Sequence, residues 1–425
     1  MNVAYTPVKA LYNQEIDDFL YRYDITTLKT PCHLLFLENF RQNIKNYIDV
    51  FYEFGMNNNI FFSCKANKSN CFIREASSCS CGIEVSSLYE LLDALKYTSR
   101  IIASGPAKSE EYLLTALDND VVISVDDIYE LRQLASFKKK SRIMIRLSDL
   151  LDNKSRFGIT VSLLDSCLEI IKNFPLIELI GFSFHINNYH LADRVHAIHK
   201  ILDLVELKNI DIQYIDIGGG FPIEYCLQED FNNFKNNLAP EIFFARKNLK
   251  EFYPYAGEIS SSNALKEILV QVYKELNGIQ IIIEPGRSLL NNCGITIFDV
   301  CYTKNLDGDY VVVTNGNINF LSEQWFDSDY LIEPILVQKK ISENRKPVLA
   351  SIAGNLCLEQ DMLTWRKIMF DDIPSHGDKL VYLNTAGYQM DSNESSFHKI
   401  PLPPRYVVRR NPNYQIVEEA EYDSY

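Results

Sequence analysis

The sequence predicts a (β/α)8 barrel followed by a second, mostly antiparallel β domain. Two observations support this prediction. Eight short apolar runs of β-forming residues alternate with amphipathic segments over about 250 residues in the middle of the chain. The last third carries β-rich runs separated by turn signals, with few helical stretches. We therefore expect the barrel over residues 36–288 and the β domain over 289–425, with the N-terminal segment 1–35 joining the β domain.

The strand candidates of the barrel are continuous apolar runs without the strict alternation of a half-exposed strand. Parallel strands that are buried on both faces have this pattern. The candidates are 60–64, 82–85, 101–104, 121–125, 143–147, 179–184, 214–217 and 280–283, and segments such as 87–96, 110–117 and 163–171 between them have helical spacing. An open, doubly wound sheet is the alternative. A dinucleotide-binding sheet of this type is disfavoured because no GxGxxG motif follows the first strand.

The β domain is predicted from five further runs. They are 297–302, 310–314, 330–338, 347–353 and 379–383. Turn signals such as Asp307-Gly308 and Gly377-Asp378 lie between them.

Composition narrows the classes of function. The 425-residue chain has a formal net charge of −14, which disfavours binding to nucleic acid. No run approaches the roughly 18 apolar residues of a membrane span, and the N-terminus lacks a signal-peptide pattern, so we expect a cytoplasmic protein. The ten cysteines show no paired CxxC spacing and are interpreted as reduced core thiols. His190, His196 and His199 have helical spacing and are interpreted as a helix face, so no metal site is predicted.

Residues suited to chemistry follow the predicted strands of the barrel. Because the carboxyl ends of barrel strands meet at one rim, residues after different strands can form one site. In chain order these residues are Lys65, Glu84, Arg146, His185, Gly218, Gly219, Gly220, Glu284, Gly286 and Arg287. Each has an ordinary structural interpretation when taken alone, and it is their shared position that indicates a site.

Pyridoxal phosphate is the cofactor whose chemistry unites these residues. The Lys65 amine can form a Schiff base with an aldehyde. The Gly218–Gly220 loop lets backbone N–H groups approach a phosphate, to which Arg287 can add a cation. Glu284 can pair with the pyridine nitrogen, and the flat imidazole of His185 can lie against the ring.

The sequence also resembles a known family. The resemblance is carried by KAN at 65–67, SxxEL at 87–91, RFGI at 156–159, FHI at 184–186, GGGF at 218–221, EPGR at 284–287, GNLCLEQDML at 354–363 and HGDKLVYLNTAGYQM at 376–390. In this order the motifs resemble the fold-type III pyridoxal phosphate enzymes, and they are most similar to ornithine and diaminopimelate decarboxylases. The likeness covers nearly the whole chain.

The resemblance implies a role for each matching residue. Lys65 would hold the cofactor as an aldimine, with Glu84 beside it and Arg146 arranging Glu84 and the cofactor. A quinonoid intermediate would follow loss of the α-carboxylate. Cys357, the family's acid, or Lys65 would return the proton. The ring would contact His185 and Glu284, and the phosphate would be bound by Gly218, Gly219, Gly220, Arg287 and Tyr388. Gly286 would also bind the cofactor. The family also implies a homodimer with shared active sites, in which the Cys357 loop enters the partner's site.

Two departures from the family bear on the substrate. The acidic residue expected immediately after Cys357 is replaced by Leu358. In segment 314–326, Ser322 and Glu323 replace an expected Arg-Pro, and Phe326 replaces a Tyr. We expect substrate contacts from Cys357, Glu359, Asp361, Glu323 and Tyr388. Because an unmatched substrate charge would be left unpaired, we expect that ornithine, lysine and diaminopimelate are not the substrate.

A larger or linked amino acid is the expected substrate class. Several members of the family act in natural-product pathways, for example in microcin C-type biosynthesis.

Two alternatives remain open at this point. An amino acid racemase would share the barrel and the lysine but would need a second base, typically a Tyr, and Cys357 in its GxxCxxxD frame favours the decarboxylase. A catalytically inactive, partner-binding homologue would tend to lose the lysine or the phosphate loop. Both Lys65 and Gly218–Gly220 are present.

Overall fold

The computed structural model describes residues 5–151, 155–257, 259, 261–321, 328–340 and 343–422 of the chain. Two compact units emerge from the packing of the backbone. One unit comprises Met1–Phe40, Ile223–Glu258 and Leu290–Tyr425, and the other comprises Arg41–Pro222 and Ile259–Leu289. Segment 223–258 thus groups with the first unit, whereas the predicted barrel range 36–288 includes it. The predicted domain boundaries themselves stay a prediction.

The second unit is an eight-stranded parallel barrel, as predicted. Its strands are hydrogen-bonded in chain order, and a bridge between Ile60 and Ile283 brings the last strand beside the first. The strands are β2 (Phe61–Ser63), β3 (Gly82–Val85), β4 (Ile101–Ala103), β5 (Val122–Val125), β6 (Ser141–Arg146), β7 (Ile177–Ser183), β8 (Tyr214–Asp216) and β9 (Gln280–Ile282). All eight coincide with the predicted runs to within a few residues.

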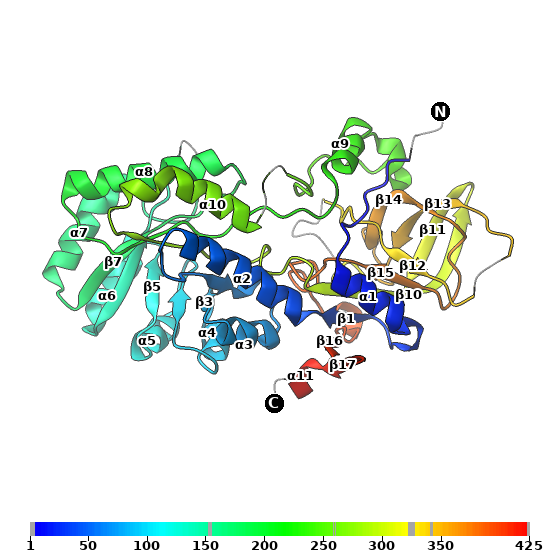
Figure 1. The fold of residues 1–425 in the computed structure, drawn as a ribbon, viewed down its shortest axis with the longest axis horizontal. Helices are drawn as coiled ribbons and strands as arrows, with labels where there is room; N and C mark the ends of the chain where they lie inside the picture. Colours follow the sequence, from blue (N-terminus) through cyan, green and yellow to red (C-terminus); the bar gives the residue numbers. More distant parts are fainter. Residues whose placement is uncertain are drawn as a thin grey trace. The chain divides into compact units, whose positions relative to one another are not determined.

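Helices surround these strands (Figure 1). They are α2 (Leu37–Glu53), α3 (Asn70–Ser78), α4 (Leu88–Ala94), α5 (Glu110–Asp118), α6 (Ile128–Phe137), α7 (Leu164–Asn173), α8 (Leu191–Lys208) and α10 (Ser261–Val272). The helices begin where the sequence supplies capping side chains: Ser87, Ser109 and Asp127 accept backbone N–H bonds at the starts of α4, α5 and α6.

The barrel has a filled apolar interior. Side chains from different strands, including Phe61, Ile102, Met144, Ile180 and Ile282, pack together and are nearly fully buried. A filled lower interior leaves the carboxyl ends of the strands as the place for a site.

The first unit contains a nine-stranded sheet. Its elements are α1 (Gln14–Arg22), β1 (Cys32–Leu35), α9 (Gln228–Asn236), β10 (Gly294–Leu306), β11 (Asp309–Thr314), β12 (Ile335–Val337), β13 (Val348–Ala353), β14 (Met362–Phe370), β15 (Lys379–Tyr382), β16 (Arg405–Arg410), β17 (Tyr414–Glu418) and α11 (Glu419–Tyr422). Six of its eight strand pairings are antiparallel, which confirms the predicted architecture. The N-terminal segment joins this sheet through β1, which lies between β10 and β16.

The predicted strand 330–338 is too long. Only Ile335–Val337 forms a strand, because Pro334 has no N–H to donate to a ladder. Strands β14, β16 and β17 were not predicted. Strands β14 and β16 contain arginine, and β14 buries the side chain of Arg366 almost completely.

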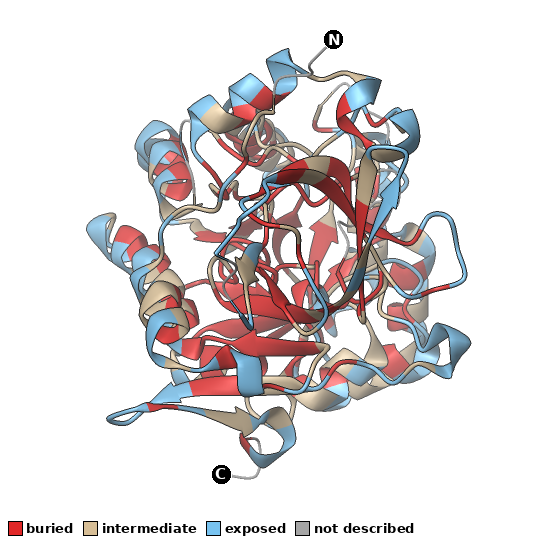
Figure 2. Ribbon diagram, turned by 90° about the vertical axis from the view of Figure 1, so that its right-hand side faces the viewer, coloured by how far each residue is buried: buried red, intermediate tan, exposed pale blue. Residues whose placement is uncertain are grey.

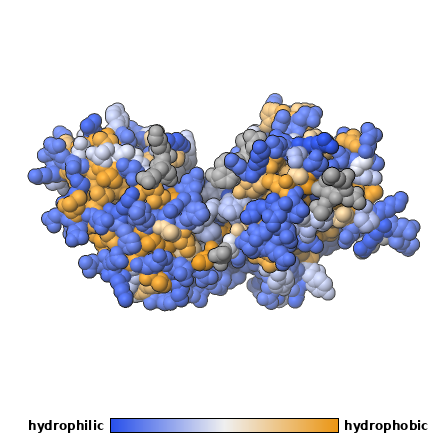
Figure 3. Space-filling model, turned by 90° about the horizontal axis from the view of Figure 1, so that it is seen from above, coloured by the Kyte–Doolittle hydropathy of each residue, from blue (hydrophilic) through white to orange (hydrophobic). Residues whose placement is uncertain are grey.

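The extent to which residues are buried differs between strands and helices. Strands are drawn mostly as buried, whereas single helices carry both buried and exposed residues (Figure 2). On the face seen in Figure 3, hydrophilic residues are interspersed with hydrophobic ones over both units. The ten cysteines are free thiols, seven of them buried. Among the described residues, no helix is long and apolar enough to cross a membrane.

Candidate active site

Parallel pairing in register brings the predicted residues to one end of the barrel. Ser63 of β2 pairs with Glu84 of β3, and Ser183 of β7 pairs with Asp216 of β8. Lys65 follows β2 in a short 3-10 helix, Cys64–Ala66. The carboxyl ends of these strands therefore carry a group of charged side chains.

Lys65 forms an ion pair with a buried carboxylate. Its Nζ lies 3.1 Å from Glu84 Oε2. Glu84 is fully buried and also accepts hydrogen bonds from the hydroxyls of Ser63, Ser86 and Ser104. Burial alone would raise the pKa of Glu84, but the Lys65 ammonium and the hydroxyl donors lower it to about 2. Glu84 is thus a fixed anion that holds the lysine, whose side chain remains 45% exposed.

Arg146 does not pair directly with Glu84 in the described part of the chain. Its Nη1 lies 3.2 Å from Asp126 Oδ1, and its guanidinium lies over the ring of Phe157. Asp126 also accepts the N–H of Gly158. Arg146 therefore anchors the RFGI segment, and its predicted effect on Glu84 stays a prediction.

The Gly218–Gly220 loop follows β8 and has a backbone that only glycine adopts readily. Gly218 and Gly220 have φ values of +68° and +74°. A Cβ on Gly219 would lie 2.5 Å from the carbonyl oxygen of Glu284. The Gly218 N–H donates to Asp216 Oδ1 at 2.9 Å. Among the described residues, the N–H groups of Gly219 and Gly220 have no hydrogen-bond acceptor.

His185 lies against this loop. A Cβ on Gly218 would meet His185 Nδ1 at 2.8 Å, so the absent side chain is what lets the ring approach. Solvent reaches the imidazole, although it is set among protein atoms on several sides. Burial, and then the charges of Lys65, Arg146 and Arg194, lower the pKa of His185 to about 3. The ring is therefore neutral at physiological pH.

Asp216 and Glu284 form a carboxyl pair on the neighbouring ends of β8 and β9. Burial raises the pKa of Asp216 to about 7. Burial and the charge of Asp216 raise the pKa of Glu284 well above its ordinary value. Asp216 Oδ2 is buried, and its hydrogen-bond partner is the carboxyl of Glu284 when one of the two carries a proton. The pair therefore retains a proton that two separate carboxylates would lose.

Gly286 and Arg287 follow Glu284 in the turn after β9. The Arg287 side chain is largely buried. The adjacent Ser288 accepts a hydrogen bond from the hydroxyl of Tyr47 on α2, at 2.8 Å. Both predicted residues thus lie at the same rim as the glycine loop.

The other predicted residues belong to the β unit. Cys357, Leu358 and Glu359 are exposed in the loop between β13 and β14. Asp361 is buried, and its two oxygens accept the N–H groups of Ile318 and Leu356, at 2.7 and 2.6 Å. Asp361 thus holds the loop in the structure, and its predicted contact with substrate stays a prediction.

Tyr388 lies after β15 with a φ of +78°. A bulky side chain is seldom found at positive φ, and such strain is concentrated at functional sites. Ser322, Glu323 and Phe326 lie outside the described residues. The roles predicted for Tyr388 and Glu323 stay predictions.

Several residues of the site were not predicted. Ser63, Ser86 and Ser104 surround Glu84, and Asp216 and Arg194 bond to the glycine loop. Asp216 could have been found as the polar residue that ends the seventh barrel strand. Arg194 has no local sequence signal, because helix α8 places it under a loop that lies more than twenty residues further along the chain.

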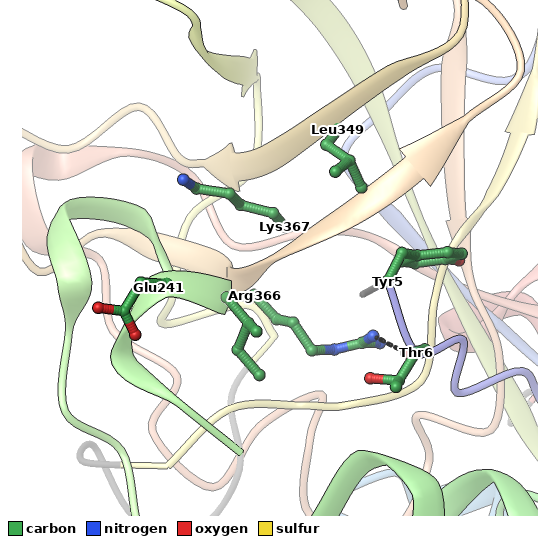
Figure 4. A pocket seen from close by; sticks show the side chains of 7 residues that line it. Tyr5, Thr6, Glu241, Leu349, Arg366 and Lys367 are labelled. Carbon is green, nitrogen blue, oxygen red and sulfur yellow. Dashed lines mark hydrogen bonds between the residues drawn. The ribbon is translucent and has the colours of Figure 1, made fainter. Parts of the chain in front are cut away.

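The β unit also has a small pocket (Figure 4), lined by Tyr5, Thr6, Glu241, Ile242, Leu349, Arg366 and Lys367. Its volume is about 30 Å³. This is room for one or two water molecules, and it is too small for an amino acid. Among the described residues, no group of His, Cys, Asp or Glu side chains suits a metal ion.

The barrel end fits pyridoxal phosphate. The free N–H groups of Gly219 and Gly220 suit a phosphate, the Lys65 amine suits an aldehyde, and the Asp216–Glu284 pair can hold a proton for a basic ring nitrogen. Phosphate, aldehyde and ring nitrogen are three of the functional groups of the cofactor.

Comparison with known proteins gives consistent results. The family model described as "Pyridoxal-dependent decarboxylase, pyridoxal binding domain" matches residues 37–291. The chain is 34% identical to the uncharacterized protein y4yA of Sinorhizobium fredii, covering 92% of this chain and 89% of that protein. It is 23% identical to an L-glutamyl-[BtrI acyl-carrier protein] decarboxylase of Niallia circulans, covering 84% of each.

A solved structure shares the fold. A diaminopimelate decarboxylase from M. jannaschi aligns with a TM-score of 0.76 at 18% identity, covering 93% of this chain and 92% of that one. At this identity the likeness shows the fold alone.

Proposed function

Because the chain belongs to the family of pyridoxal-dependent decarboxylases, we propose that it removes the α-carboxylate of an amino acid that is part of a larger molecule. The family match favours a carboxy-lyase over the racemase that the sequence left open. The observation that supports the general reaction is the Lys65–Glu84 ion pair at the same barrel end as the glycine loop.

The bound cofactor supplies an aldehyde for the substrate amine and an aromatic ring that accepts the electron pair left on Cα. We assign the residues around it as follows. Lys65 binds the aldehyde, and Glu84 keeps the lysine amine in place between turnovers. The Gly218–Gly220 loop and Arg287 bind the phosphate, and His185 presents a neutral ring face.

Glu284 and Asp216 hold a proton at the carboxyl ends of β8 and β9. A proton held there stabilises negative charge that develops on a nearby ring nitrogen. Cys357 or Lys65 returns a proton to Cα. Cys357 lies in an exposed loop, so we propose that this loop acts in the site of a second copy of the chain, as a homodimer with shared sites requires.

The proposed substrate class has two supports. Leu358 gives an apolar, 45% exposed side chain at the position where the sequence departs from the family's acidic residue. A relative of similar length is named as acting on a glutamyl group on an acyl-carrier protein. A substrate linked through its distal end has no free distal charge, so it needs no acidic reader at Leu358.

Two experiments test the proposal. Borohydride reduction of the cofactor-loaded protein, followed by peptide mass mapping, should place the pyridoxyl group on Lys65. A folded protein with no adduct at Lys65 would contradict the cofactor assignment.

Carbon dioxide release should then be compared between free and linked substrates. We expect turnover of a glutamyl group or another amino acid linked to a carrier protein or peptide, and little turnover of ornithine, lysine or diaminopimelate. Efficient decarboxylation of any of these three free amino acids would overturn the substrate proposal and leave the reaction class intact.

A further inference from the structure

Arg194 is a buried cation at the start of helix α8. Its residue exposure is 1%, and its Nη2 donates to the carbonyl oxygens of Gly219 and Gly220, at 3.2 and 3.0 Å. Longer contacts of 3.5 Å reach the carbonyls of Ile186 and His190. Burying a charge is costly unless the charge is compensated. All the described hydrogen bonds of this guanidinium go to backbone carbonyls, and the shortest two go to the glycine loop.

These bonds determine which way the loop's N–H groups point. In a planar trans peptide the C=O and the N–H point in opposite directions. Because the Gly219 carbonyl points to Arg194, the N–H of Gly220 points away from Arg194. The Gly220 carbonyl also points to Arg194, so the N–H of Phe221 points away from it as well. The Gly218 carbonyl accepts the N–H of Glu284 at 2.9 Å, which orients the N–H of Gly219.

The guanidinium also closes one side of the loop. A Cβ on Gly220 would lie 2.5 Å from Arg194 Nη2, so no side chain fits between them. Any ligand must therefore reach the loop's N–H groups from the side opposite Arg194. A cation on the closed side strengthens the attraction of those N–H groups for an anion.

We propose that Arg194 is a positioning residue for the cofactor's phosphate. It acts through the glycine loop, by fixing the carbonyls of Gly219 and Gly220 so that the loop's N–H groups are free for the phosphate. This inference rests on the proposed function, because the anion is taken to be the phosphate of the cofactor. It differs from the roles of the glycines and Arg287 because Arg194 need not touch the phosphate.

The test compares two ligands that differ only in the phosphate. Cofactor-free protein is titrated with pyridoxal phosphate and with pyridoxal, and binding is followed by the ligand's absorbance and by equilibrium dialysis. We expect Arg194→Met to weaken binding of pyridoxal phosphate by about ten- to a hundredfold, the effect of losing hydrogen bonds to a charged group. In the same variant, the affinity for pyridoxal should be unchanged. Inorganic phosphate, which should compete with pyridoxal phosphate in the wild-type protein, should no longer do so.

Arg194→Lys serves as the second variant, in case the methionine variant does not fold. It keeps the charge but not the planar fork, so it should weaken pyridoxal phosphate binding less than Arg194→Met does and should again spare pyridoxal. Equal weakening of both ligands, or of neither, in a folded variant would overturn the proposal.

The matched control is Arg366→Met in the β unit. Arg366 is equally buried, and it also donates to a backbone carbonyl, that of Thr6, at 2.7 Å (Figure 4). It donates in addition to the carbonyl of Leu331 at 2.9 Å and, unlike Arg194, pairs with a carboxylate, Glu333 Oε1, at 3.0 Å. This variant should lose stability but keep the wild-type ratio of the two affinities.

If wild-type protein binds neither ligand, the proposed function itself fails. If wild type and Arg194→Met prefer the phosphorylated ligand equally, only the role of Arg194 fails.

Discussion

At the scale of single residues, Asp216 contacts two parts of the proposed site. Its Oδ1 accepts the N–H of Gly218 at the start of the glycine loop, and its other oxygen faces Glu284. One carboxyl group thereby connects the loop that we propose for the phosphate with the acid that we propose for the ring nitrogen. Because the two carboxyls lie close together at the ends of adjacent strands, with little access to water, they resist carrying two negative charges together.

The raised pKa of Asp216 predicts how stability depends on pH. The folded protein keeps this proton up to about pH 7, whereas an unfolded aspartate loses it near pH 4. The stabilisation by this group is therefore complete below about pH 4 and is lost as the pH rises through about 7. In Asp216→Asn, which stays neutral, the thermal midpoint of the cofactor-free protein should depend less on pH between about 5 and 8.

An exposed carboxylate provides the control for that experiment. Asp211→Asn, just before β8, also removes one negative charge but does not touch the buried pair. Its midpoint should follow the wild-type pH profile. If Asp216→Asn also retains the wild-type profile, Asp216 is ionised throughout this range and its raised pKa is refuted.

The sequence predicted which residues lie at this end of the barrel, but it did not predict their hydrogen-bond and ion-pair partners. Lys65, Glu84, His185 and Glu284 could be found because each follows a recognisable strand, and barrel strands align their carboxyl ends. The hydroxyls around Glu84 could not be found, because they come from neighbouring strands and depend on exact register. Arg146 was predicted to act on Glu84, but its described ion pair is with Asp126. This difference depends on side-chain directions, which sequence spacing does not determine.

At the scale of elements, the loop between β13 and β14 is held by a buried carboxylate. Asp361 accepts the N–H of Leu356 within the loop and that of Ile318 in a neighbouring turn. A Cβ on Gly354 would lie 2.3 Å from the Asp361 carboxylate, so this position needs glycine. The exposed Cys357 is therefore carried by a loop with a fixed base.

We predict that Asp361→Asn loosens this loop. The amide group can accept only one of the two backbone N–H bonds, so the cost should be about 1–3 kcal/mol. Hydrogen exchange should become faster at the amides of Leu356 and Ile318. Glu359→Gln, an exposed change in the same loop, should leave exchange at both amides unchanged. If Asp361→Asn raises KM without changing exchange, Asp361 acts on substrate instead of holding the loop.

Strands could be predicted from the sequence where most of their side chains are apolar and buried. Most residues of the barrel strands are apolar, so their runs are visible in the sequence. Strand β14 was missed because Arg366 and Lys367 interrupt its apolar run. Only the structure reveals the Glu333 carboxylate and the carbonyls that compensate the buried Arg366. A buried charge with distant partners is a tertiary effect that local pattern cannot report.

At the scale of the whole molecule, the proposed chemistry uses residues from both units. Lys65 belongs to the barrel unit, and Cys357 belongs to the β unit. If each active site combines Lys65 of one subunit with Cys357 of another, the two residues can be supplied by different chains. A dimer with two-fold symmetry then contains two identical composite sites.

This arrangement predicts complementation between two inactive variants. If Cys357 is the group that returns the proton to Cα, Lys65→Ala and Cys357→Ala should each lose most of their decarboxylase activity. When the two are mixed and allowed to exchange subunits, half of the dimers carry one chain of each kind, and each of these dimers has one intact site. About a quarter of all sites, and hence about a quarter of wild-type activity, should return. If exchange is verified by mass spectrometry and activity does not return, Lys65 and Cys357 serve the same chain's site, and the shared-site dimer is excluded.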